Sequence, residues 1–478
     1  MDPDAKDPSK RLELDPDAMR ALGYAAVDAV VDHVTTLRDQ PVAGATPSRE
    51  ALEARLREPA PDEGRPWDQV LARLTGEVFT GRLRFDHPRF FGYVPGPSNF
   101  PAVVADFVAA GHNVFGGAWV GSPGAAQVEL VTIDWLRAAM GLPEGMGGLF
   151  VSGGSMANLT ALAAARHALG AAGDHVVYFS DQTHFATPRA LRVLGFDPGA
   201  LRELPSGPDL QLDPGALATA IAADRRDGRT PFCVVANVGT TSSGAVDPLP
   251  ELAALCRAEG LWLHGDGAYG AAAALCDRGR AAVAGIELLD SLAFDPHKWL
   301  FQPFETGLVL VRDPNLLRAT FGVTSAVIRD AARALEEVSF FEYGVQLTRA
   351  PRALKVWFAL QVFGMRAFRD AVAHGLDLAE HAERQLRAAP HWEVATPASL
   401  GIVTFRHLPA GAPVDDAVLD AHQRRLTQRL TDDGYALLST TELHGRTVLR
   451  LCPINPRTTA ADVDATLARL HALAADDG

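Results

Sequence analysis

Asp-Pro-His-Lys-Trp-Leu, residues 295–300, follows an apolar run at residues 288–294 and holds Lys298 between a histidine and a tryptophan. A lysine amine in a partly desolvated pocket loses its proton more readily, because burial disfavours the charged form. The neutral amine can then form a Schiff base with an aldehyde. An isolated lysine is most often a solvated surface residue, so a chemical role for Lys298 needs a second group to support it.

That second group is an acid at the end of a strand-like stretch upstream. Asp266 lies 32 residues before Lys298, in His-Gly-Asp-Gly-Ala-Tyr-Gly at residues 264–270. The interval is long enough for a helix and a returning strand, so both side chains can reach one pocket. Pyridoxal 5′-phosphate (PLP) is an aldehyde cofactor that uses a lysine Schiff base and an acidic partner for its pyridine nitrogen. Asp266 and Lys298 together predict a PLP site.

A phosphate-binding turn is predicted where a short apolar run meets a helical pattern. Residues 150–154 read Phe-Val-Ser-Gly-Gly, and Ser155 begins the helical pattern. Glycines let the backbone approach an anion closely, and a helix N-terminus offers free N–H groups and a partial positive charge. Such a turn is often only a turn, but beside Asp266 and Lys298 it predicts that Gly153, Gly154 and Ser155 bind the cofactor's phosphate.

Strands and helices alternate through the middle of the chain, which predicts an α/β domain with a mainly parallel sheet. Candidate strands lie at residues 176–180, 232–238, 261–264 and 306–312. Ligands bind at the carboxyl ends of strands in such sheets. Four candidate functional residues directly follow candidate strands or end them, namely His184, Thr241, Asp266 and Lys298.

Helices are predicted on both sides of this region. Apolar residues recur at helical spacing from residue 17, a second helix covers residues 49–57 after the cap-like Ser48, and a third covers residues 67–79. Later helices are expected at residues 354–363 and 371–388. The tail predicts strands at 401–405, 436–439 and 447–451 and helices at 414–433 and 461–474, which is typical of a small α+β domain.

Three stretches together resemble the group II PLP-dependent decarboxylases, whose best-known member is aromatic-L-amino-acid decarboxylase. They are residues 295–299, residues 264–270, and Gly-Thr-Thr-Ser-Ser-Gly-Ala-Val-Asp-Pro-Leu at residues 239–249. The resemblance runs from about residue 86 to the C-terminus. It implies the fold type I architecture of PLP-dependent transferases, with an N-terminal helical dimerisation segment at 1–85, a large PLP-binding domain at 86–370 and a small C-terminal domain at 371–478. It also implies an intimate homodimer.

The resemblance assigns roles around the cofactor. Lys298, His184 and Asp266 would be catalytic: His184 stacks on the pyridine ring and helps in proton transfer, and Asp266 keeps the ring nitrogen protonated. Ala268 leaves room for the other face of the ring, and His297 lies near the phosphate. Thr241 also matches a family position near the cofactor.

The predicted substrate pocket departs from the family pattern. The family's Tyr-Phe-Pro-Thr becomes Tyr93, Val94, Pro95 and Gly96 here, and an aromatic residue that approaches from the partner subunit falls on Gly117, two residues after Phe115. A tyrosine on the family's mobile loop, which protonates the substrate's α-carbon after CO₂ leaves, is matched by Val327. We expect the smaller residues to open the pocket for a bulky L-amino acid, with neutral drift as the alternative explanation.

These departures leave the product open between three reactions at the substrate's α-carbon, through an external aldimine and a quinonoid. The first is plain decarboxylation to an amine. The second is decarboxylation-dependent oxidative deamination to an aldehyde, since valine cannot donate the proton that the tyrosine supplies. The third is β-elimination by a C–S lyase on an S-substituted cysteine. A binding or scaffold protein on an inactive fold is disfavoured because Lys298, Asp266, His184 and the glycine turn are all present.

Composition narrows the class of protein. The chain has 478 residues, 47% of them hydrophobic, and a formal net charge of −14. Such a charge argues against nucleic-acid binding, which relies on clustered cations. Four scattered cysteines predict no metal site or disulfide framework. With no signal-peptide pattern at the polar N-terminus and no apolar run approaching the ~18 residues of a membrane span, we expect a cytoplasmic enzyme that contacts no membrane.

Overall fold

The computed structural model describes residues 12–170, 174–322, 337–410 and 415–476. Its largest feature is a seven-stranded sheet in the order β1-β7-β6-β5-β4-β2-β3. The strands are β1 (Gly147–Val151), β2 (His175–Ser180), β3 (Leu201–Leu204), β4 (Thr230–Asn237), β5 (Trp262–Asp266), β6 (Ser291–Phe294) and β7 (Gly307–Val311). Only β7 is antiparallel to its neighbours, and the four other pairings are parallel. The α/β class with a mainly parallel sheet is therefore confirmed.

The central strands are apolar because helices and loops cover both faces of the sheet. Residues 232–237 of β4 and all of β5, β6 and β7 are buried. The surrounding helices are α4 (Phe100–Gly111), α5 (Pro123–Ala139), α6 (Gly154–Leu169), α7 (Ala186–Val193), α8 (Pro214–Arg226), α9 (Leu249–Glu259), α10 (Asp277–Ala282) and α11 (Asn315–Phe321). Helix α6 contacts β5, β6 and β7, and small alanines along its buried side let it lie close to the sheet.

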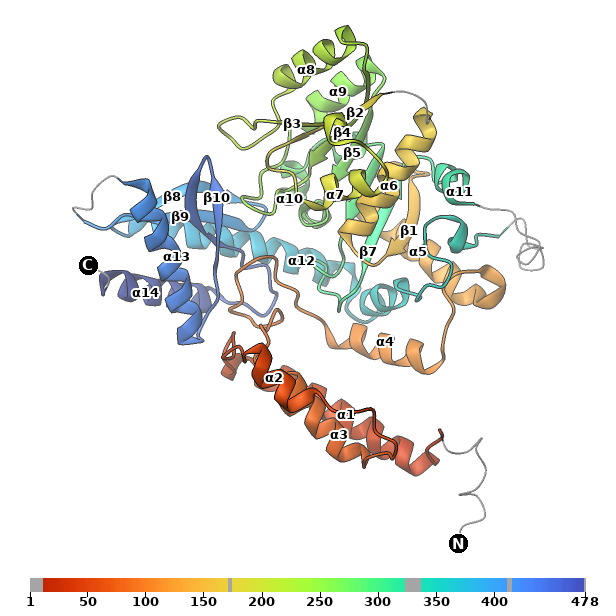
Figure 1. Cartoon of the computed structure of the whole chain (residues 1–478), viewed down its shortest axis with the longest axis vertical. Coiled ribbons are helices and arrows are strands. Elements are labelled where there is room, and N and C mark those ends of the chain that lie inside the picture. The colour runs from red at the N-terminus through yellow and green to blue at the C-terminus, as the bar shows by residue number, and fades with distance from the viewer. Residues whose placement is uncertain (1–11, 171–173, 323–336, 411–414, 477–478) are drawn as a thin grey trace.

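A second, four-stranded antiparallel sheet lies beside the first in the order β10-β11-β9-β8 (Figure 1). Its strands are β8 (Trp392–Ser399), β9 (Ile402–His407), β10 (Ser439–Leu443) and β11 (Arg446–Leu451), and it carries α13 (Asp416–Asp433) and α14 (Ala460–Ala475). Helix α12 (Ala353–Ala388) connects the two sheets and crosses residue 370 without a break. The predicted helices at 354–363 and 371–388 are one element that kinks at Gly364, where φ is 76°, a value that glycine adopts readily.

One local prediction for the tail was wrong, and one strand of the tail was missed. Residues 436–438 are buried but do not belong to the small sheet, which they reach only at Ser439. Leu437 instead pairs with Phe90, and its carbonyl accepts a hydrogen bond from the Phe91 N–H at 2.8 Å. Strand β8 was not predicted, because its residues carry no regular apolar alternation.

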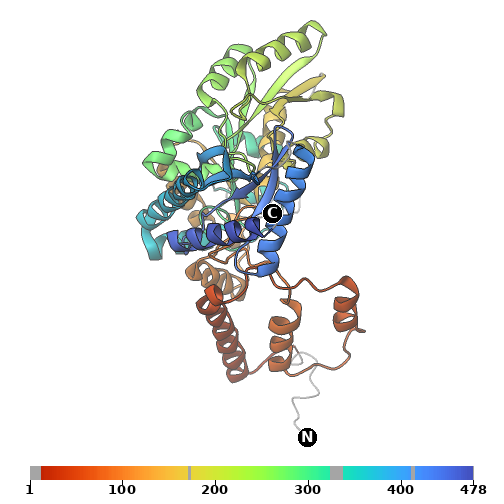
Figure 2. The same cartoon turned by 90° about the vertical axis from the view of Figure 1, so that its left-hand side faces the viewer.

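The N-terminal helices are α1 (Pro16–Thr36), α2 (Arg49–Leu56) and α3 (Trp67–Arg73), and they extend away from both sheets (Figures 1 and 2). The predicted cap at Ser48 is confirmed, since its hydroxyl accepts the Ala51 N–H at 3.1 Å. Helix α3 continues as a π-helical turn to Val78. No helix within the described ranges combines the length and the apolar character that a membrane crossing requires.

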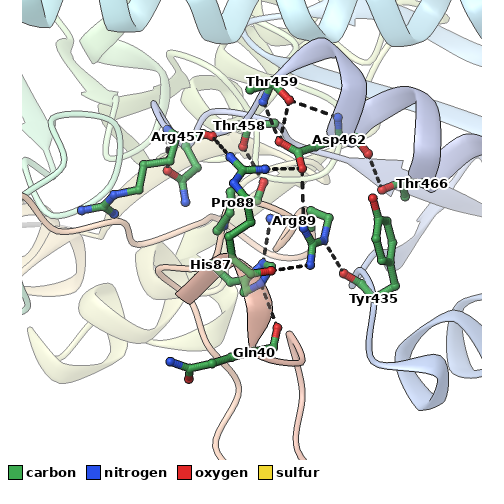
Figure 3. Close-up of polar contacts among 12 residues, drawn as sticks. Gln40, His87, Pro88, Arg89, Tyr435, Arg457, Thr458, Thr459, Asp462 and Thr466 are labelled. Carbon is green, nitrogen blue, oxygen red and sulfur yellow. Dashed lines mark hydrogen bonds and ion pairs between the residues drawn. The ribbon is translucent and has the colours of Figure 1, made fainter. Parts of the chain in front are cut away.

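A polar junction ties the N-terminal segment to the small sheet's helices (Figure 3). The Arg89 guanidinium donates to the Tyr435 carbonyl at 2.8 Å and lies 3.6 Å from the Asp462 carboxylate. His87 bonds the Gln40 carbonyl through Nε2 at 3.1 Å, and its Nδ1 accepts the Arg89 N–H at 2.9 Å. Segments distant in sequence are thereby held together around one buried arginine and one buried histidine.

Candidate active site

One pocket of about 440 Å³ lies at the carboxyl ends of β2, β4, β5 and β6. The strand-end rule therefore located it correctly from sequence. All nine residues predicted to bind the cofactor line this pocket. They are Gly153, Gly154, Ser155, His184, Thr241, Asp266, Ala268, His297 and Lys298.

Lys298 is held in a tight turn after β6. Its backbone N–H donates to the Asp295 carbonyl at 2.9 Å, and its Nζ lies 2.9 Å from the Asp295 carboxylate. The chain contains only four lysines. Lys6 and Lys10 precede the described residues, and Lys355 is buried and paired with Asp106 at 2.7 Å. Lys298 is therefore the one lysine of the described ranges whose amine lines the pocket.

The glycine pair of the predicted phosphate turn is required by packing as well. A Cβ on Gly154 would lie 2.8 Å from the Ala268 Cβ, and a Cβ on Gly153 would lie 3.1 Å from a carbon of the His297 ring. The turn leads into the first turn of α6, where backbone N–H groups have no acceptor within the helix. Gly153 and Gly154 thus let an N–H-rich turn approach the loop that carries Lys298.

Asp266 ends a chain of four buried hydrogen bonds. The Trp262 indole donates to the Ser291 hydroxyl at 2.8 Å, and that hydroxyl lies 2.8 Å from His264 Nδ1. His264 Nε2 lies 2.7 Å from Asn158 Oδ1, and Asn158 Nδ2 donates to Asp266 Oδ2 at 3.0 Å. Burial lowers the pKa of His264 to about 4, so its ring is neutral.

The groups at the two ends of this series of hydrogen bonds determine which atom donates in each of them. An indole N–H can only donate, and an ionised carboxylate can only accept. Ser291 therefore donates to His264 Nδ1, and His264 Nε2 donates to Asn158. Each member is satisfied while Asp266 accepts from Asn158, so these hydrogen bonds hold the Asp266 side chain in place at the pocket.

His184 follows β2 and lines the same pocket. Its Nδ1 accepts the Ala186 N–H at 3.2 Å, and its ring centre lies 4.1 Å from that of Phe185. Burial lowers its pKa, with the Asp266 carboxylate acting in the opposite direction. A neutral His184 whose Nδ1 accepts carries its proton on Nε2, which makes it a hydrogen-bond donor.

A second buried brace supports the pocket from behind β4. Asp247 accepts the backbone N–H groups of Asn237 at 2.6 Å and Leu212 at 2.8 Å, and also the Asn237 side-chain amide at 3.0 Å. Burial raises the pKa of Asp247 to about 6. Asn237 lines the pocket and reaches Ser180 at the end of β2, so the brace joins two strand ends.

The predicted substrate-side residues that the structure describes lie outside this pocket's lining. Gly96 packs against the Phe304 ring, 2.8 Å from where its Cβ would be, and Gly117 packs against the Phe115 ring and the Leu347 carbonyl. Within one chain a Cβ at either glycine would contact these neighbours, and the expectation that the two glycines enlarge the substrate pocket stays a prediction. Phe115 lines a neighbouring pocket that shares Glu305 with the first. Val327 lies outside the described residues.

Several residues of the site were missed by sequence reasoning. Asn158, Asn237 and Asp295 line the pocket, and Arg450 of β11 donates to the Thr241 and Tyr93 carbonyls. Asn237 ends β4, so the strand-end rule had the means to find it. Asn158 and Arg450 sit inside a helix and a strand, where their spacing carries no signal.

The residues present fit PLP. A glycine turn at a helix N-terminus suits the phosphate, a positioned carboxylate suits the ring nitrogen, and a half-buried histidine and a small alanine suit the two ring faces. PLP requires a lysine amine for its covalent attachment and a carboxylate for its ring nitrogen. Both groups line the pocket.

Known proteins agree with this geometry. The model of the pyridoxal-dependent decarboxylase conserved domain matches residues 50–408. Aromatic-L-amino-acid decarboxylase of Bacillus atrophaeus is 47% identical over 98% of this chain and 97% of its own. Phenylacetaldehyde synthase of Arabidopsis thaliana is 32% identical over 91% and 92%. A crystal structure of Oryza sativa TDC with PLP and tryptamine superposes with a TM-score of 0.92 at 29% identity, covering 97% and 99%.

Family, fold and cofactor follow together from the pocket and from these matches. The cofactor is PLP, and the enzyme is of the PLP-dependent carboxy-lyase class. The chain belongs to the pyridoxal-dependent decarboxylase family.

Proposed function

We propose that this enzyme decarboxylates an aromatic L-amino acid to its amine, with Lys298, Asp266 and His184 as the catalytic residues. The observation that carries the proposal is the convergence of these three side chains on one pocket, with Asp266 fixed by Asn158. The 47% identity to a protein named aromatic-L-amino-acid decarboxylase supports the substrate class.

Bound PLP supplies an electron sink for the charge that remains when the substrate's carboxylate leaves. The Asp266 carboxyl group would lie beside the ring nitrogen, where a negative charge favours the protonated form of that nitrogen. Lys298 would hold the cofactor through its side-chain amine. His184 would lie against one ring face with its Nε2 proton available, and Ala268 would leave room at the opposite face. Gly153, Gly154 and Ser155 hold the phosphate, with His297 and Thr241 beside the cofactor.

An aldehyde product is the second candidate, and Val327 favours it. A positioned general acid contributes roughly 10²–10⁴-fold, so a missing proton donor lets slower competing routes dominate. Two relatives are named phenylacetaldehyde synthase, at 32% and 28% identity. Both candidates share the pocket described above and differ only in the fate of the α-carbon.

The N-terminal helices support a homodimer. Helix α1 has no buried residue, and apolar side chains along α1, α3 and the π-helical turn are exposed. They are Met19, Tyr24, Val27, Val30, Val31, Val70, Leu74 and Val78. Burial of apolar surface drives protein association, and a second copy with the same helices offers a matching face. The cytoplasmic location and the division at residues 85 and 370 stay predictions, to be tested by fractionation and limited proteolysis.

The amount of each product formed per CO₂ released distinguishes the candidate reactions. The loaded enzyme is incubated with tyrosine, phenylalanine, tryptophan and an S-alkylcysteine, with and without O₂, and CO₂, amine, aldehyde, pyruvate and peroxide are each measured. One amine per CO₂, unaffected by O₂, is the expected result. Aldehyde and peroxide that disappear without O₂ would establish the second candidate, and pyruvate without CO₂ would refute both.

A variant pair then tests the role of Val327. Val327→Tyr restores a proton donor, and Ile328→Tyr places the same side chain at the next position as a control. If the wild type forms aldehyde, Val327→Tyr should raise the ratio of amine to aldehyde and Ile328→Tyr should not. If the wild type forms only amine, neither variant should change the product.

A further inference from the structure

The Asp295 carboxylate lies where the lysine and the predicted phosphate turn meet. Its side chain is 2% exposed. Oδ2 lies 2.9 Å from Lys298 Nζ, and a Cβ on Gly154 would also lie 2.9 Å from Oδ2. Asp295 is thus in contact with the residue that would carry PLP and with the turn that would hold its phosphate.

Lys298 is the only charged partner that Asp295 has within the described residues. His297 Nε2 is 3.7 Å away, but burial lowers the pKa of His297, and its Nδ1 accepts the Thr306 N–H at 3.1 Å. His297 is therefore neutral. Oδ1 of Asp295 is buried and has no hydrogen-bond partner among the described residues. A buried carboxylate with one partner depends heavily on that partner.

Cofactor binding would change two neighbours of Asp295 at once, the Lys298 amine and the glycine turn. The Lys298 amine has to move from the carboxylate to the aldehyde carbon, so Asp295 loses its ammonium partner. The phosphate has to approach the Gly153–Gly154 turn, which places a second anion close to a carboxylate in a site of low dielectric. Charges of like sign at such distances repel strongly when water is excluded.

We propose that Asp295 limits the affinity of this enzyme for PLP. The carboxylate holds the Lys298 ammonium in the cofactor-free protein and opposes the phosphate in the loaded protein, so both effects favour release. The inference rests on the proposed roles of Lys298 and of the glycine turn. It identifies Asp295 as a positioning residue that sets how readily the cofactor exchanges.

The test compares Asp295→Asn with Asp290→Asn. Asparagine keeps the shape of aspartate and removes its charge. Asp290 directly precedes β6, whereas Asp295 directly follows it. The Asp290 carboxylate accepts the Leu263 N–H at 2.8 Å, and Asp290 is not part of the pocket lining. Cofactor-free proteins are titrated with PLP and, separately, with pyridoxal, which lacks the phosphate. Binding is followed by absorbance and tryptophan fluorescence rather than by turnover.

Asp295→Asn should lower the dissociation constant for PLP by about 10–100-fold and that for pyridoxal by a smaller factor. Its Tm should fall without cofactor, because Lys298 loses its partner, and should rise more than that of wild type when PLP is added. Asp290→Asn should leave the ratio of the two dissociation constants unchanged. Asp295→Ser, which also lacks the charge, should reproduce the direction of each effect.

An unchanged or weaker affinity for PLP in both Asp295 variants would overturn the proposal. An equal gain for PLP and pyridoxal would also overturn it, because the phosphate would then not be what Asp295 opposes. Borohydride reduction of each complex separates this failure from that of the proposed site. If PLP is fixed to Lys298 while the affinities do not change, only the role of Asp295 is wrong.

Discussion

The Asn158 side-chain amide donates to the Asp266 carboxylate at 3.0 Å and accepts from His264 on its other side at 2.7 Å. Asn158 is 1% exposed and lies on α6, the helix whose first residue is Gly154. One helix therefore carries both the predicted phosphate turn and the group that orients the acid for the pyridine nitrogen. The spacing between the glycine turn and Asp266 is set by this helix.

Removal of the Asn158 amide should weaken cofactor binding and activity together. Hydrogen bonds to charged groups contribute about 1.5–3 kcal/mol, which corresponds to roughly a 10- to 100-fold effect. We expect Asn158→Leu to lower kcat and PLP affinity by that factor and to shift the absorption band of the bound cofactor. Asn315→Leu, at an exposed helix start, is the control. Wild-type kcat in Asn158→Leu would show that Asp266 needs no orienting partner.

A buried ion pair beneath the glycine turn should be critical for stability. Glu129 and Arg349 are almost fully buried and form two short contacts of 2.6 and 2.9 Å, and each also bonds the Phe150 backbone. Arg349→Met leaves a buried carboxylate without its partner, which costs about 3–5 kcal/mol. Urea unfolding measures this loss. The double variant Glu129→Gln/Arg349→Met should lose less than the single one, and a single-variant loss under about 1 kcal/mol would contradict the assignment.

Acid should destabilise the fold below pH 6.5, chiefly through two histidines. Burial lowers the pKa of both His264 and His87 from 6.5 to about 4. The unfolded chain binds more protons between these values, so the free energy of unfolding falls as pH falls, by up to about 3 kcal/mol for each histidine. Asp247, whose pKa is raised from 3.8 to about 6, acts in the opposite direction over the same range.

Urea unfolding of the cofactor-free protein at pH 7 and pH 5 checks these signs. His87→Gln should reduce the loss of stability between the two pH values, because the glutamine does not titrate. Asp247→Asn should increase the loss, because the opposing contribution is removed. A stability that rises from pH 7 to pH 5 in the wild type would contradict the assignment of His87 and His264 as buried neutral groups.

The exposed face of α1 should hold two copies of the chain together. Val27 and Val30 are 42% and 36% exposed on a helix without a buried residue. Val27→Glu combined with Val30→Glu should convert a dimer to a monomer at micromolar concentration in sedimentation equilibrium. Asp28→Asn combined with Asp32→Asn alters neighbouring charged positions and should leave the dimer intact. A charged double variant that sediments as a dimer would place the interface elsewhere.

The residues that line the pocket were predictable where each lies in a local context that sequence displays. His184, Thr241, Asp266 and Lys298 follow or end strands with recognisable apolar runs, and the glycine pair precedes a helical pattern. The parallel sheet then brings those strand ends to one edge.

Contacts between distant segments were not predictable in the same way. The surroundings of Gly96 depend on Phe304, more than two hundred residues later, whose ring lies 2.8 Å from where a Cβ at residue 96 would be. The roles of Asn158 and Asp295 likewise depend on side-chain directions that a spacing pattern does not contain. Leu437 pairs with Phe90 rather than with the small sheet. The apolar residues around Leu437 do not indicate which of these two partners it takes.

The identity of the cofactor-bearing lysine tests the central claim most directly. The chain has four lysines, so borohydride reduction of the PLP-loaded enzyme, followed by proteolysis and mass spectrometry, gives an unambiguous answer. The account predicts one reduced PLP adduct per chain, on Lys298, and its complete loss in Lys298→Ala while Lys355→Arg retains it. An adduct on Lys6, Lys10 or Lys355 in the wild type would contradict the account.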